Sequence, residues 1–147
     1  MEDFWSFDKD ILRAENTTAN GILKEQADLL TQKTDSILQG KVKNYVLTEK
    51  DIALNIETAF EIVVPNLDNY TCILFYVYSK AEQNFPIIFS RYKMSKEENQ
   101  WGKFEDTIHE NDIANDDVQF KRILKEVLGS SETNEKIKVL YQKAASK

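Results

Sequence analysis

The sequence contains three apolar runs that alternate with a period of two residues, at positions 54–64, 70–78 and 85–90. The short stretches that join them are polar and rich in residues that form turns. Alternation of this kind is typical of β-strands with one buried face, because successive side chains in a strand point to opposite sides of the sheet. The sequence therefore predicts an antiparallel meander.

The three runs differ in how apolar their two faces are. In the run 54–64, the face opposite the apolar side chains carries Glu57 and Glu61, so we expect this strand to be half exposed. The run 70–78 is apolar on both faces, which favours a central position. Pro86 lacks the N–H that a ladder needs, which places it at an edge or at the start of its strand.

Weaker patterns extend the sheet at both ends. Alternation over residues 42–46 predicts a short strand before the meander, and loose apolar spacing over residues 101–108 favours a further strand after it. We therefore expect four or five strands.

Three other segments have the apolar spacing of amphipathic helices. The first covers residues 20–38, and Gly40 stands where a helix often ends. The second follows a capping residue at Asn115 or Asp116 and stops at Gly129. A serine directly after this glycine, Ser130 or Ser131, caps the third helix, so the chain closes on a helix pair.

Together these patterns predict an α+β fold. An antiparallel sheet of four to five strands carries the N-terminal helix and the C-terminal helix pair on one face. The chain has 147 residues, of which 41% are hydrophobic, and this suits a single domain. We place that domain at residues 20–147, after an N-terminal extension of residues 1–19.

The N-terminal extension carries Phe4, Trp5 and Phe7 among acidic residues. We expect these rings to fold back as a satellite of the core, because burial of aromatic side chains is strongly favourable. The alternative is that they anchor another chain.

The net charge, the single cysteine and the absence of a recognisable targeting signal limit which partners and which compartment we expect. The formal net charge of -6 disfavours nucleic acid and anionic membranes as partners and leaves basic or neutral proteins. Cys72 is the only cysteine, so the chain forms no internal disulfide. The first residues do not resemble a secretory signal, and no apolar run approaches the ~20 residues that span a bilayer. We expect a cytoplasmic protein.

The sequence shows no recognisable catalytic constellation. Cys72 lies in a predicted strand, where burial raises the pKa of a thiol. His109, the only histidine, stands in an acidic stretch that we interpret as a solvated loop and not as a metal site. The four glycines form neither a dinucleotide-binding turn nor a phosphate-binding loop. We expect no cofactor and no bound metal, and we favour a protein that is not an enzyme.

Aromatic residues in strands usually fill cores, but tyrosine, tryptophan and arginine are also frequent at binding hot spots. The candidate binding residues are therefore the aromatic and basic side chains on and after the predicted strands: Tyr70, Tyr76, Tyr78, Arg91 and Trp101.

Three segments resemble a group of small, uncharacterised bacterial proteins. Residues 22–34 are similar to a helix of the form Ile-Leu-x-Glu-Gln-Ala, and residues 60–70 to a strand that ends in Pro-x-Leu-x-Asn-Tyr. Residues 130–133 are similar to the Ser-x-x-Thr start of a closing helix. The resemblance covers roughly residues 20 to 145 and implies a bacterial cytoplasmic origin, without an activity.

Our first functional hypothesis is a non-enzymatic interaction or accessory protein, acidic like an immunity protein, that binds a basic or neutral protein. The alternative is a small-molecule-binding protein or a carboxylate-dependent enzyme with a pocket between sheet and helices, built from residues such as Tyr70, Tyr76, Arg91 or Glu57. A third hypothesis is homo-oligomerisation through an unprotected edge strand.

Overall fold

The computed structural model describes residues 1–12, 18–100, 103 and 108–146. Its centre is a five-stranded sheet in which neighbours in sequence are neighbours in space and every pair is antiparallel. This order confirms the predicted meander and places the third strand at the middle. The strands are β1 (Gln39–Val46), β2 (Ile56–Val64), β3 (Tyr70–Ser79), β4 (Ile87–Ser90) and β5 (Ile113–Ala114).

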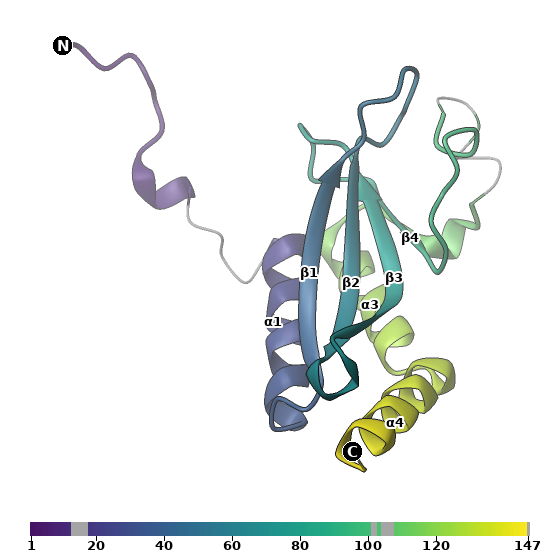
Figure 1. Cartoon of the computed structure of the whole chain (residues 1–147). Helices are drawn as coiled ribbons and strands as arrows, with labels where there is room; N and C mark the ends of the chain where they lie inside the picture. Colours follow the sequence, from purple (N-terminus) through teal and green to yellow (C-terminus); the bar gives the residue numbers. More distant parts are fainter. Residues whose placement is uncertain (13–17, 101–102, 104–107, 147) are drawn as a thin grey trace.

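Three helices pack on one face of this sheet (Figure 1). They are α1 (Ala19–Lys33), α3 (Asp117–Leu128) and α4 (Ser131–Ala145). Leu23 of α1 and Phe120 of α3 belong to the same buried cluster as Phe60 of β2. The predicted α+β fold, with the N-terminal helix and the C-terminal helix pair on one sheet face, is confirmed.

A side-chain cap begins each of these helices, and the caps at Asp116 and Ser130 are among the residues that the sequence predicts. The Thr18 hydroxyl accepts a hydrogen bond from the N–H of Gly21, and the Asp116 carboxylate accepts one from the N–H of Gln119. Ser130 caps α4 in the same way. Each cap satisfies a backbone donor that has no partner inside its helix. No helix among the described residues has the length and apolar character needed to cross a membrane.

The predicted end of the first helix is wrong by five residues. α1 ends at Lys33, because Asp35 and Ser36 adopt positive φ angles that no α-helix contains. Gly40 is not a helix stop and lies instead in β1. A Cβ atom at Gly40 would stand 2.4 Å from the carbonyl oxygen of Ala27, so this glycine lets α1 approach the sheet closely.

The last two strands of the sheet are β4 and β5. Pro86 directly precedes β4, in agreement with its predicted place at the start of a strand. The fifth strand is Ile113–Ala114, which pairs with Ile87 and Ile88 of β4. The strand predicted at 101–108 falls mostly on residues outside the described part of the chain.

The prediction that the N-terminal rings fold back onto the core is wrong for the described residues 1–12. Phe4 is 87% exposed and Trp5 is 73% exposed. The Trp5 and Phe7 rings lie against each other, with centroids 5.4 Å apart. Figure 1 shows this segment, which ends in a short 3-10 helix (Lys9–Leu12), standing apart from the sheet.

Candidate functional site

A bulge in β3 decides which side chains share a face of the sheet. Phe60 of β2 lies opposite Phe75, but the next residue, Glu61, lies opposite Ile73, so Leu74 is an extra residue in β3. Leu74 and Phe75 both join the core under the helices. The alternation of β3 therefore reverses at this point, and the side chains after it change faces.

The reversal separates the candidate binding residues. Tyr76 and Tyr78 lie opposite Ala59 and Glu57, on the face away from the helices. Tyr70 lies opposite the core residue Val64, on the helix side, and is 55% exposed at the start of β3. A strand without the bulge would carry all three tyrosines on one face.

The two remaining candidates lie elsewhere. Arg91 follows β4 on the helix side and forms an ion pair with Glu132 of α4. Trp101 lies outside the described residues. Of the predicted set, the structure brings together Tyr76 and Tyr78 only.

We call the sheet surface away from the helices the open face. At one end a small second core covers it, and no described segment covers the other end. The open face carries these side chains on its first three strands: Lys41, Lys43, Tyr45, Glu57, Ala59, Glu61, Val63, Thr71, Ile73, Tyr76 and Tyr78. The second core consists of Ala53, Leu54, Tyr78, Ile88 and Met94.

Asn99 ties the loop over this second core to the sheet. Its side-chain oxygen accepts a hydrogen bond from the N–H of Leu54 at 2.9 Å, and its side-chain amide donates to the carbonyl oxygen of Leu54 at 2.8 Å. Its own carbonyl accepts from the N–H of Ala53. Asn99 is 1% exposed, so these bonds fully satisfy a buried amide that would otherwise be costly.

A buried polar pair stands at the covered end of the open face. The Tyr78 hydroxyl donates to the Glu57 carboxylate at 2.9 Å and accepts from the N–H of Met94 at 2.8 Å. Burial raises the pKa of Tyr78, and the Glu57 carboxylate raises it further, while the Met94 hydrogen bond lowers it. Tyr78 therefore remains a protonated donor that fixes the orientation of Glu57.

Glu61 is the second buried carboxylate of this face, and it is less well satisfied. The residue is 3% exposed, and its Oε1 atom accepts no hydrogen bond from the described residues. The nearest cation is Lys43, whose Nζ lies 3.5 Å from that oxygen and whose side chain is 52% exposed. The prediction that this strand is half exposed is thus wrong, because β1 and β3 flank β2 and their long side chains cover its polar face.

Two further titratable groups of the sheet, Tyr76 and Cys72, have raised pKa values. Burial raises the pKa of Tyr76, and Glu57 and Glu61 raise it further. Burial also raises the pKa of the Cys72 thiol, although Lys136 opposes this. Groups held in their protonated forms donate hydrogen bonds but attack no substrate at neutral pH.

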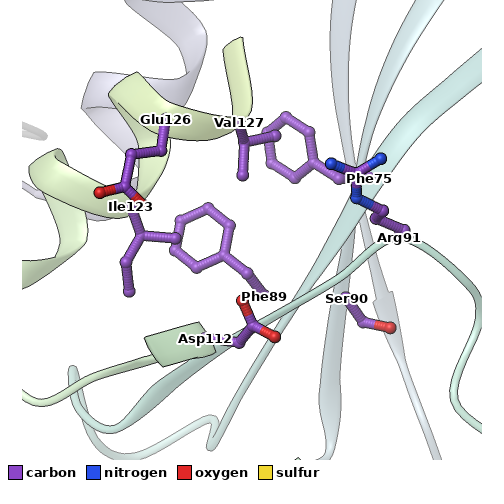
Figure 2. A pocket seen from close by; sticks show the side chains of 8 residues that line it. All are labelled: Phe75, Phe89, Ser90, Arg91, Asp112, Ile123, Glu126 and Val127. Atoms are coloured by element: carbon purple, nitrogen blue, oxygen red, sulfur yellow. The ribbon is translucent and has the colours of Figure 1, made fainter. Parts of the chain in front are cut away.

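A small cavity of about 230 Å³ lies between the sheet and α3. Figure 2 shows Phe89 of β4 pointing toward Ile123 of α3, with the carboxylates of Asp112 and Glu126 nearby. This volume is below the ~300 Å³ at which ligand pockets begin. The predicted lining residues Tyr70, Tyr76 and Glu57 do not line this cavity, and Arg91, which does, is paired with Glu132. A larger cavity of about 520 Å³ lies between α1 and the sheet, with Leu23, Thr58 and Val77 in its lining.

The described residues contain no group of three side chains able to hold a metal ion. His109 is exposed, and its Nδ1 accepts a hydrogen bond from the N–H of Asn111. Comparison of the chain with family models, with curated proteins and with solved structures finds no match.

Sequence reasoning missed two residues of this site. Asn99 stood in a polar connector with no periodicity, and nothing in its neighbourhood indicated burial. The burial of Glu61 had a signal in the sequence. Glu61 lies between Phe60 and Ile62 in a strand with a neighbour on each side, and side chains of those neighbouring strands cover it.

Proposed function

We propose that this protein is a non-enzymatic interaction protein, an accessory or immunity-like protein of the bacterial cytoplasm, that binds a basic segment of another protein on its open face. The observation that carries the proposal is the buried Oε1 atom of Glu61, which lacks a hydrogen bond from the described residues.

An incompletely satisfied buried carboxylate favours a partner that supplies donors. Leaving a buried charged acceptor unpaired costs several kcal/mol, of the order of the penalty for breaking a buried ion pair. Lys43 offsets part of this cost, but at 3.5 Å and half exposed it is a loose neighbour of Glu61. An arginine guanidinium presents a planar fork of donors that matches a carboxylate, so it satisfies Glu61 better than Lys43 does.

Exposed apolar side chains of the open face provide the remaining contact. Ile73 on β3, directly opposite Glu61, is 37% exposed, and Tyr45 on β1, opposite Glu57, is 45% exposed. Lys41 lies opposite Glu61 on β1, so a bound cation must approach from the β3 side to avoid like charge. The net charge of -6 attracts a basic partner at long range.

The test is an NMR titration of the isotope-labelled protein with a seven-residue peptide in which arginine and valine alternate. We expect amide shifts at Tyr45, Glu61 and Ile73. Glu61→Gln should weaken binding about tenfold or more, since a hydrogen bond to a charged group contributes about 1.5–3 kcal/mol.

Glu135→Gln is the matched control, because it removes the same charge from an exposed position on α4. It should leave binding within about twofold, as expected for an exposed charge. Shifts that map to another surface, or an equal loss in both variants, would refute the proposal. Urea unfolding of Glu61→Gln verifies that the variant is folded.

A second candidate function is small-molecule binding, favoured by a cavity of about 340 Å³ beside the buried Glu57 carboxylate. Lys93 and Lys96 also line this cavity, so it offers both charges to an amphoteric ligand such as an amino acid. A thermal-shift screen of the twenty amino acids tests this candidate. Stabilisation that disappears in Glu57→Gln supports it, and a screen without any stabilising amino acid rules this ligand class out.

A further inference from the structure

We call the described residues 1–12 the N-terminal arm. This arm exposes several apolar side chains to solvent. Besides Met1, five large apolar side chains are exposed in this short segment: Phe4 (87%), Trp5 (73%), Phe7 (41%), Ile11 (68%) and Leu12 (65%). Single exposed apolar residues are ordinary, but a contiguous group of this kind marks an interaction site.

A groove between α1 and α3 offers a matching surface. It has a volume of about 540 Å³, and its apolar lining comes from Ile22 of α1 with Leu124 and Leu128 of α3. Lys121 and Lys125 stand on consecutive turns of α3 at the same groove. We call this the α1/α3 groove.

The arm and the groove are complementary in charge as well as in polarity. Glu2, Asp3, Asp8 and Asp10 surround the arm's aromatic residues, and Lys9 is its only basic side chain. The groove lining carries Lys121 and Lys125 against one acidic side chain, Glu25 of α1, so its net charge is positive. Opposite charges around an apolar contact fix the orientation of a bound segment.

We propose that the N-terminal arm of one copy docks in the α1/α3 groove of a second copy, and that reciprocal exchange forms a homodimer. In the single chain the arm's side chains are exposed and its own groove is open, so the arm has no intramolecular site in this structure. The inference is independent of the proposed function, since it uses none of the open face.

The exchanged surface is large enough for a stable dimer. A covered aromatic side chain buries about 150–250 Å², and each arm carries three such rings. The six rings of two arms bury up to about 900–1,500 Å², so with the groove surfaces that they cover the exchange reaches the roughly 1,200 Å² of a small specific interface.

Analytical ultracentrifugation of the full chain, at up to about 100 μM, tests the proposal. We expect a dimer in the wild type. The double variant Trp5→Ala, Phe7→Ala should raise the dimer dissociation constant about 1,000-fold or more, because it removes two aromatic hot-spot anchors from each arm. Both side chains are exposed in the single chain, so the variant should fold normally. Tyr92→Ala, which removes an aromatic side chain that is 80% exposed outside the arm, is the control and should leave the dimer intact.

A second pair of variants tests the groove. Lys121→Glu with Lys125→Glu should weaken the dimer about tenfold or more through like-charge repulsion of the arm. Lys138→Glu with Lys143→Glu makes the same charge change on exposed positions of α4 and should have little effect. A monomeric wild type, a dimer that survives loss of Trp5 and Phe7, or equal effects of the two lysine pairs would each overturn the proposal.

Discussion

The side chains of the same three strands are buried on both faces of the sheet, but through different interactions. On the helix side, aromatic and aliphatic side chains form one apolar cluster in which Phe60 stacks on Phe75 with centroids 5.2 Å apart. On the open face, burial depends on polar groups, with Tyr78 bonded to Glu57 and Asn99 bonded to Leu54. Apolar packing is non-directional, whereas each polar contact requires one partner in one geometry. The helix-side packing therefore tolerates small shifts, whereas the open face carries a buried oxygen, Oε1 of Glu61, that accepts no hydrogen bond from the described residues.

The largest expected difference between the faces is in the cost of truncation. Phe60→Ala should lower the free energy of unfolding by about 3–5 kcal/mol, because it removes a ring that is 2% exposed and leaves a cavity under the helices. Ile73→Ala on the open face should cost less than about 1 kcal/mol, since its side chain already contacts water. Urea unfolding measures both, and equal losses would contradict the comparison.

Asn99 tests whether the open face depends on single polar contacts. Asn99→Ala leaves the N–H and the carbonyl of Leu54 buried without partners, which should cost about 2–4 kcal/mol. Hydrogen exchange of the Leu54 amide should accelerate by more than the global loss of stability explains. Asn84→Ala, at an exposed asparagine, is the control and should change neither.

Tyr78 gives the open face a pH dependence. Its pKa in the folded protein is raised above the ordinary value of 10.0, so the unfolded chain loses this proton first and stability falls as the pH rises above about 10. Tyr78→Phe should cost about 1–3 kcal/mol at neutral pH, by removing the partner of Glu57 and Met94.

Urea unfolding between about pH 8 and pH 11 checks this sign, because tyrosine titrates in that range. Tyr78→Phe should lose less stability with rising pH than the wild type does. Tyr70→Phe, at an exposed tyrosine on the other face, should keep the wild-type slope. A Tyr78→Phe protein with the wild-type slope would show that another group carries the effect.

The smallest effect is expected from the polar contact on the helix side. Arg91 and Glu132 are each about half exposed, so their ion pair is screened by water. Arg91→Gln should cost less than about 1 kcal/mol in urea unfolding, close to the effect of Arg122→Gln at an exposed position of α3. A loss comparable to that of Asn99→Ala would show that directional contacts matter equally on both sides of the sheet.

Much of the fold is predictable because its signals are local. Alternation places β2 and β3, Pro86 marks the start of β4, and Asp116 and Ser130 cap α3 and α4. The site is less predictable, since its members come from separate segments. Glu57 and Asn99 lie 42 positions apart in the sequence, and only the loop over the second core brings both to one end of the open face.

By itself, the sequence determined the strand order and the helix-bearing face, because these follow from periodicity, caps and short connections. The tertiary structure decided where Tyr76 and Tyr78 point, since the extra residue Leu74 reverses β3 and no periodic pattern reports a bulge. It also decided that Glu57 and Glu61 are buried and that Gly40 belongs to a strand. Burial depends on what neighbouring strands and helices cover, and that information lies outside the segment being covered.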